Sequence, residues 1–230
     1  MKKHTLFLST VLILGVVITS LLFFCPASSS PQSHQLKNII QNTLPSVVLI
    51  QSPAWTLGAG SIIDAQKGMI LTGKHFLHAR DTYTVRTETG ESYRVEKIIP
   101  HPMHDIAILQ INPDDVFRSH RSLPIVDSQA FLERGDDVLS FGALPINSAI
   151  IFSRGIISDT YQALQLDISQ KSDYFIQTDI NAQAGFSGGP LFDERGQIIG
   201  VNTAVFGVNT SVSWSTPVTA RDVQGLSSEL

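Results

Sequence analysis

The segment AGFSGGPL, residues 184–191, places a serine between a phenylalanine and a pair of glycines. Glycine and serine are common in turns between strands, so the segment has a structural interpretation. It also has a catalytic one, in which Ser187 is a nucleophile and the glycines let backbone N–H groups and a substrate chain approach closely. The catalytic interpretation requires more of the chain, because a nucleophilic serine needs a base and a group that orients the base.

Two upstream segments supply these partners. In GMILTGKHFLHA, a strand pattern ends and His75 follows on a turn, and in HPMHDIAILQI an alternating apolar strand begins at Asp105. A serine hydrolase needs a base to take the hydroxyl proton and a carboxylate to hold the tautomer of that base. The chain order His75, Asp105, Ser187 is the order found on a double β-barrel. We therefore expect these three residues to be catalytic, in a cleft between two halves.

The chain around these segments reads as short strands. Runs rich in β-branched residues and separated by turns are typical of sandwiches and barrels. The polar stretch 113–135 divides them into two groups of similar strand count. The expected strands are 46–52, 60–65, 68–73, 82–88, 92–99, 105–112, 137–143, 149–158, 173–180, 189–193, 197–207 and 211–218. This pattern predicts an all-β fold of two six-stranded barrels, at about 44–115 and 134–219, with short helices near both ends.

The N-terminal helix is expected at residues 35–45, where the apolar side chains share one helical face and Pro45 ends the helix. A different segment precedes it. Lys2 and Lys3 are followed by an apolar run from Thr5 to Phe24, of about 20 residues, which indicates export and is long enough to span a bilayer. Residues 1–30 are therefore a signal-anchor or a cleaved signal peptide, and both place residues 31–230 outside the cytoplasm.

Composition excludes other classes of function. The net charge is −4 and no basic run is visible, so nucleic acid is not an expected partner. The single cysteine, Cys25, lies in or beside the apolar N-terminal segment, so no disulfide or thiolate metal site is expected in the folded part. Histidines at 75 and 78, and at 101 and 104 beside Asp105, offer a metal-binding alternative, but none has a familiar zinc spacing. We expect neither a metal nor a cofactor.

The turn around Ser187 also predicts an oxyanion site. Gly185, Phe186 and Ser187 supply consecutive backbone N–H groups, and Gly185 is free to adopt a positive φ. N–H groups that converge in this way stabilise the oxyanion of a tetrahedral intermediate.

The segments GAGSIIDAQKGMILTGKH, HDIAILQI and IQTDINAQAGFSGGPLFDERGQIIGVNTA resemble the HtrA (Deg) serine proteases, and the likeness runs from about Leu44 to Thr219. The resemblance implies a trypsin-like double barrel spanning residues 31–230. It implies His75 as general base, Asp105 as its orienting group and Ser187 as nucleophile. It also implies an oxyanion hole made by the N–H groups of Gly185 and Ser187.

The sequence departs from the HtrA pattern at several positions. HtrA proteins usually have Asn-Pro-Gly-Asn before the Ser-Gly-Gly-Pro motif, where this chain has Gln183-Ala184-Gly185-Phe186, and Asn-Asn before the histidine, where it has Gly73-Lys74. Phe186 has no carboxylate that could form an ion pair with the amino group of a newly cut N-terminus. Activation by N-terminal cleavage is therefore not expected. The PDZ domain that usually follows in HtrA proteins is expected to be missing.

The resemblance also locates the substrate pocket. Asn181 corresponds to the base of the primary pocket, and Thr203, Ala204 and Val205 correspond to its wall. Because Asn181 is neutral, we expect a small or medium aliphatic side chain at the cleaved position rather than lysine or arginine.

We therefore expect a serine endopeptidase that cleaves unfolded or exposed segments of extracytoplasmic proteins through an acyl-enzyme, with the substrate bound as an added strand. The resemblance implies a homo-oligomer, typically a trimer, and the N-terminal segment implies contact with the membrane. The alternative is a binding module that keeps the protease fold but has an inactive oxyanion loop, and Phe186 and Lys74 are the residues that favour it.

Overall fold

The computed structural model describes residues 31–53, 56–78, 81–112, 117, 119–144, 149–164, 173–205 and 212–228. The expected export or membrane segment and Cys25 lie outside these ranges. Within them, no helix combines the length and the apolar character needed to cross a membrane. The chain divides into two compact units, Met1–Asn38 and Ile39–Leu230. The second unit contains both barrels and is described below.

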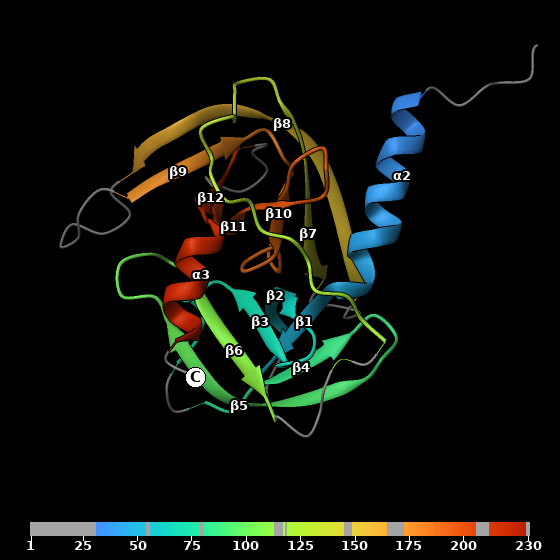
Figure 1. Ribbon diagram of the computed structural model, residues 1–230, viewed down its shortest axis with the longest axis vertical. Helices are drawn as coiled ribbons and strands as arrows, with labels where there is room; N and C mark the ends of the chain where they lie inside the picture. Colours follow the sequence, from blue (N-terminus) through green and yellow to red (C-terminus); the bar gives the residue numbers. More distant parts are fainter. Residues whose placement is uncertain are drawn as a thin grey trace, which may run out of the picture. The chain divides into compact units, whose positions relative to one another are not determined.

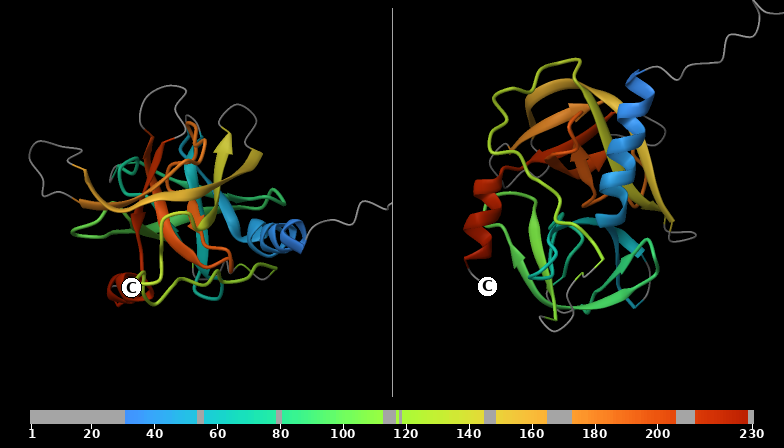
Figure 2. Two further views of the ribbon diagram at one scale, coloured as in Figure 1. Left: turned by 90° about the horizontal axis from the view of Figure 1, so that it is seen from above. Right: turned by 45° about the vertical axis from the view of Figure 1, so that its right-hand side comes forward.

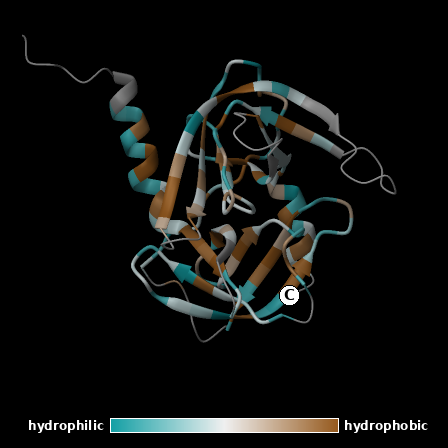
Figure 3. Cartoon of the chain, turned by 180° about the vertical axis from the view of Figure 1, so that it is seen from behind, coloured by the Kyte–Doolittle hydropathy of each residue, from teal (hydrophilic) through white to brown (hydrophobic). Residues whose placement is uncertain are grey.

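The first barrel is closed, with the strand order β1-β2-β3-β6-β5-β4. Its antiparallel strands are β1 (Val47–Gln51), β2 (Thr56–Asp64), β3 (Met69–Thr72), β4 (Thr84–Thr87), β5 (Ser92–Pro100) and β6 (Ala107–Ile111). Alternate apolar side chains of these strands, including Ile50, Ile70 and Leu109, fill the barrel interior. Figure 3 shows the hydrophobic residues concentrated in these strands.

The second barrel is also closed, with the order β10-β11-β12-β9-β8-β7. Its strands are β7 (Asp137–Leu144), β8 (Ala149–Leu164), β9 (Asp173–Thr178), β10 (Pro190–Phe192), β11 (Ile198–Val205) and β12 (Ser213–Pro217). The barrels lie one above the other in Figure 1. The prediction of an all-β fold of two six-stranded barrels is confirmed. Strand β8 is longer than expected because its first part pairs with β7 and its polar second part pairs with β9.

The described part of the chain also has one α-helix before the strands in sequence and one after them. The N-terminal helix α2 spans Pro31–Thr43 and a 3₁₀ turn, Leu44–Ser46, follows it. The α-helix thus ends two residues before Pro45, because proline disfavours the α conformation in the residue before it. The C-terminal helix α3, Ala220–Ser227, begins with a capping box and buries Leu226 against β3, β5 and β6 of the first barrel. Figure 2 shows α3 beside this barrel from two further directions.

Candidate active site

His75 and Asp105 meet because β3 and β6 are paired neighbours. His75 lies just beyond the end of β3, Asp105 lies just before the start of β6, and Thr72 pairs with Ala107 between them. The Nδ1 atom of His75 lies 2.7 Å from Oδ2 of Asp105, and the backbone N–H of His75 donates to Oδ1 over 2.8 Å. Both carboxylate oxygens therefore hold the histidine.

This pairing determines what His75 can do. A carboxylate is an acceptor, so the proton of the neutral imidazole lies on Nδ1 and the lone pair lies on Nε2. The His75 side chain remains 35% exposed while that of Asp105 is 17% exposed. The ring also makes an edge contact with Phe76, with centroids 5.2 Å apart. The imidazole is thus fixed in the orientation and tautomer that a general base requires.

The turn that carries Ser187 packs against the turn that carries His75. The Ser187 carbonyl accepts a hydrogen bond of 2.9 Å from the N–H of Ala59 in β2, which links the two barrels. A Cβ atom at Gly188 would lie 2.9 Å from the backbone nitrogen of Gly73, so only glycine allows this approach. Among the described residues, no hydrogen bond joins the Ser187 hydroxyl to His75. In unliganded enzymes such contacts are often long and tighten when substrate binds.

The residues before Ser187 form a type II turn. The N–H of Phe186 donates to the carbonyl of Gln183 over 2.9 Å, and Gly185 has a φ of 99°. Within the described part of the chain, neither the N–H of Gly185 nor that of Ser187 has a hydrogen-bond partner. The prediction that Phe186 supplies a third oxyanion donor needs correction, because its N–H is engaged in the turn. Two free donors remain, as an oxyanion hole requires.

The side chain of Phe186 is buried, with 2% of the residue exposed. It packs over Gly142 in β7, where a Cβ atom would come within 2.5 Å of the ring carbon Cγ and 2.7 Å of Cα. The adjacent N–H of Ala143 donates to the Gly185 carbonyl over 2.8 Å. The aromatic ring of Phe186 therefore anchors the turn 183–187 on the second barrel.

Sequence reasoning missed Asn202, a buried residue of β11 that supports the same turn. Its side-chain amide donates to the Ser140 hydroxyl over 2.7 Å and to the Phe186 carbonyl over 3.2 Å, and its Oδ1 accepts from Ser215. Its backbone exchanges hydrogen bonds with Gly188 and Gly189. No motif indicates this role, because it depends on three strands that meet only in the folded barrel.

The expected pocket residues lie in the second barrel, after β9 and at the end of β11. Asn181 is exposed and follows β9. Thr203, Ala204 and Val205 form the end of β11, and the Thr203 hydroxyl shares a 2.6 Å hydrogen bond with that of Thr216. The side chains of Ala204 and Val205 are outside the described part. Their roles in substrate binding stay predictions.

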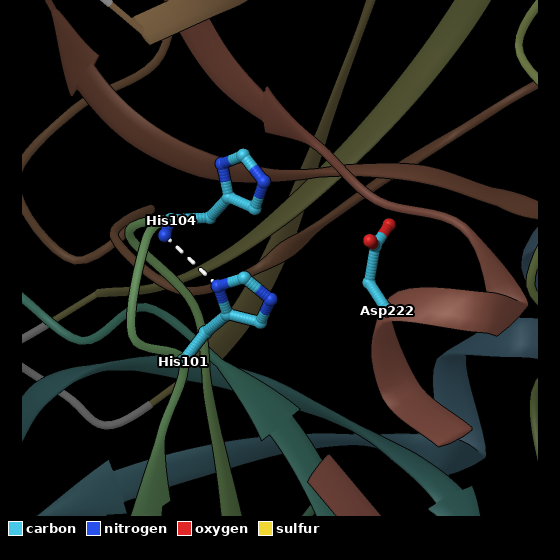
Figure 4. A group of neighbouring side chains, drawn as sticks. All are labelled: His101, His104 and Asp222. Carbon is cyan, nitrogen blue, oxygen red and sulfur yellow. Dashed lines mark hydrogen bonds between the residues drawn. The ribbon is translucent and has the colours of Figure 1, made fainter. Parts of the chain in front are cut away.

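A separate polar cluster joins His101, His104 and Asp222 (Figure 4). One nitrogen or oxygen atom of each lies within 4.8 Å of those of the others. The metal-binding alternative that was set aside from the sequence would have used Asp105 as the carboxylate. In the structure Asp105 binds His75, and the carboxylate beside His101 and His104 is that of Asp222 in helix α3.

Hydrogen bonding decides what this cluster can hold. Nδ1 of His101 accepts the N–H groups of Met103 and His104, over 3.1 and 2.9 Å. The ring proton of neutral His101 therefore lies on Nε2, the nitrogen in Figure 4 that faces away from this bond. A metal needs a lone pair on the nitrogen that binds it. The arrangement fits a hydrogen-bonded cluster better than a metal site.

Comparisons with known proteins agree with this geometry. Residues 58–201 match the trypsin-like peptidase domain family. The chain is 31% identical to the periplasmic serine endoprotease DegP of Escherichia coli K12, over 78% of this chain and 37% of that protein. It is 29% identical to the mitochondrial serine protease HTRA2 of Bos taurus, over 87% of this chain and 44% of that protein. The chain thus spans less than half the length of these relatives.

A solved structure shares the fold. The crystal structure of an inactive form of Rv3671c from Mycobacterium tuberculosis H37Rv superposes with a TM-score of 0.66 at 21% identity, covering 89% of this chain and 95% of that one. At this identity the likeness concerns the fold alone.

Proposed function

Because the chain belongs to the trypsin-like peptidase family and is an HtrA-like member of it, we propose that it is a serine endopeptidase that uses His75, Asp105 and Ser187. The observation that carries this proposal is the two-point bond between His75 and Asp105, over 2.7 and 2.8 Å. A carboxylate that only capped the start of β6 would not be expected to bind both the ring and the backbone N–H of a histidine.

The proposed reaction is acyl transfer. Nε2 of His75 takes the proton of the Ser187 hydroxyl as Oγ attacks the substrate carbonyl carbon, and the imidazolium is stabilised by Asp105. The N–H groups of Gly185 and Ser187 donate to the oxyanion. The amine leaves with the proton from His75, and the acyl group stays on Ser187. Water then attacks the acyl carbon while His75 takes its proton, and Ser187 leaves with that proton as the acid product is released.

The alternative of a non-catalytic binding module depends on an inactive oxyanion loop. The type II turn, with its positive φ at Gly185 and its two unpartnered N–H groups, supports the enzyme instead. Phe186, the residue that favoured the alternative, is buried beside Gly142 in the second barrel.

We propose unfolded or exposed protein segments outside the cytoplasm as the substrates. The periplasmic relatives and the apolar segment 5–24 support this location. The substrate would pair with the end of β11, with a small or medium aliphatic side chain beside Asn181. A homo-oligomer and a retained membrane anchor belong to the same proposal. Cell fractionation with N-terminal sequencing distinguishes an anchor from a cleaved signal, and light scattering gives the assembly state.

The test uses the purified full chain and unfolded casein, with Ser187→Ala as the matched variant. The wild type should cleave casein and react with a fluorophosphonate at Ser187. The variant should do neither and should keep the same unfolding temperature, because only the hydroxyl of a partly exposed residue is removed. Equal cleavage by both proteins would overturn the assignment of Ser187. If neither cleaves and the wild type does not react with the fluorophosphonate, the binding module is the better interpretation.

A further inference from the structure

His101 fastens the turn that leads to Asp105. Its Nδ1 accepts the N–H groups of Met103 and His104 over 3.1 and 2.9 Å, and its own N–H donates to the carbonyl of Ile106 over 2.9 Å. These bonds hold the residues on both sides of Asp105. The position of the carboxylate therefore depends on His101, which does not touch it.

The same residue is bonded to the segment that carries His75. Nζ of Lys74 donates to the His101 carbonyl over 3.0 Å, and Lys74 directly precedes the catalytic histidine. His101 thus contacts the neighbours of both Asp105 and His75.

The protonation state of His101 decides whether the turn forms. Two N–H donors at Nδ1 need a lone pair there, so a proton on Nδ1 would face both donors and break both bonds. Burial and the stacked ring of His104, with centroids 4.6 Å apart, lower the pKa of His101, and Lys74 acts in the same direction. Asp222 opposes them, but its Oδ2 already accepts from the N–H and hydroxyl of Thr219.

We propose that neutral His101 is a positioning residue for the catalytic pair: its Nδ1 lone pair fixes the turn that presents Asp105 to His75. The inference rests on the proposed protease function and deepens it. Activity then requires two histidines to be unprotonated, His75 to act as the base and His101 to hold the turn.

This role has a signature in the pH profile of kcat/KM. A single base gives about a ten-fold loss per pH unit on the acid side. Two groups that must both be unprotonated give a limb that steepens toward about a hundred-fold loss per unit below the lower of the two pKa values. If either group no longer titrates, only the single-base limb remains, so the steep part disappears when His101 is replaced by a group that does not titrate.

Two substitutions of His101 distinguish the hydrogen bonds that its side chain accepts from its titration. In His101→Asn, the side-chain oxygen can accept the same two N–H groups in an Asx turn and does not titrate. In His101→Ala, the acceptor is lost. With an internally quenched peptide as substrate, we expect His101→Ala to lose about 100-fold in kcat/KM, as a displaced catalytic group does. His101→Asn should stay within about five-fold of the wild type at neutral pH and lose the steep part of the acid limb.

His78→Asn is the matched control, because His78 is exposed in the same barrel and lies outside this turn. It should keep both the rate and the steep acid limb. Wild-type activity in His101→Ala, or an unchanged steep limb in His101→Asn, would overturn the inference. The asparagine variant keeps the test valid if the alanine variant does not fold. Failure of the proposed function looks different, because the wild type itself would then be inactive or would act without Ser187.

Discussion

The proposed active site is assembled from two turns that are held by different forces. In the first barrel, the turn 101–105 is held by polar bonds to an imidazole that is only partly buried. In the second barrel, the turn 183–187 is held by a buried phenyl ring and by backbone hydrogen bonds. The first turn positions Asp105, the proposed orienting group, and the second positions Ser187 and the N–H groups proposed to bind the oxyanion.

The difference determines which change disturbs each turn. Hydrogen bonds to an imidazole are lost when it is protonated, so the first turn is sensitive to pH. A close-packed aromatic ring has no titratable group but tolerates little added volume, so the second turn is sensitive to a single methyl group. The predictions below perturb each turn in its own way.

The largest effect is expected at Asp105, at the end of the first turn, residues 101–105. In Asp105→Asn the amide can offer its NH₂ group to His75, which then holds the wrong tautomer, with the proton on Nε2. We expect kcat to fall by about 10⁴-fold while the fold is kept. Peptide hydrolysis measures the rate, and the thermal unfolding midpoint should stay within about 4 °C of the wild type. A loss of less than ten-fold would show that Asp105 does not orient the base.

The second-largest effect is expected from a methyl group added beneath the second turn, residues 183–187. In Gly142→Ala the added carbon would lie 2.5 Å from Cγ of Phe186 and 2.7 Å from its Cα. Displacing Phe186 moves the N–H of Gly185, and loss of one oxyanion donor costs about 10²- to 10³-fold in kcat. Fluorophosphonate labelling should slow in parallel, and the shape of the acid limb should not change.

Gly225→Ala is the matched control for this substitution, since a Cβ atom at Gly225 in helix α3 meets nothing within 4 Å. It should keep full activity, and alanine is the better helix former. Wild-type labelling by Gly142→Ala would mean that the turn does not depend on the contact between Gly142 and Phe186.

The two turns also differ in how far the sequence could predict them. The strands were predictable because β-branched runs report local preference. The bond between His75 and Asp105 was predictable because each residue lies at the end of a strand in a fold with known strand pairing. The contact between Gly142 and the Phe186 ring was not predictable, because nothing in the sequence around a glycine inside a strand indicates which ring will pack on it.

One contact in each turn could not be predicted from the sequence. Asp222 lies in helix α3, and nothing in its neighbourhood along the chain connects it to His101. The N–H of Phe186 was assigned to the oxyanion hole from its place in the sequence, but the turn uses it internally. The first outcome is decided by a tertiary contact, and the second by a local turn hydrogen bond between residues three apart.

The smallest effect is expected on the pH dependence of stability. The pKa of His101 is lowered by burial first and by His104 next. In the unfolded chain His101 binds a proton near its ordinary pKa of about 6.5. As the pH falls from there toward the lowered pKa, the unfolded state holds more protons than the folded state, so folding stability decreases over that window and not below it. The loss is at most about 1.4 kcal/mol per pH unit for one proton.

His101→Asn should remove this contribution, because asparagine does not titrate. Urea unfolding at pH 7.5, 6.5 and 5.5 should therefore give a shallower loss of stability in the variant than in the wild type, while His78→Asn should follow the wild type. Parallel curves for the wild type and His101→Asn would mean that protonation of His101 does not weaken the fold. The turn 183–187 has no counterpart to this experiment, since the Phe186 ring that anchors it carries no titratable group.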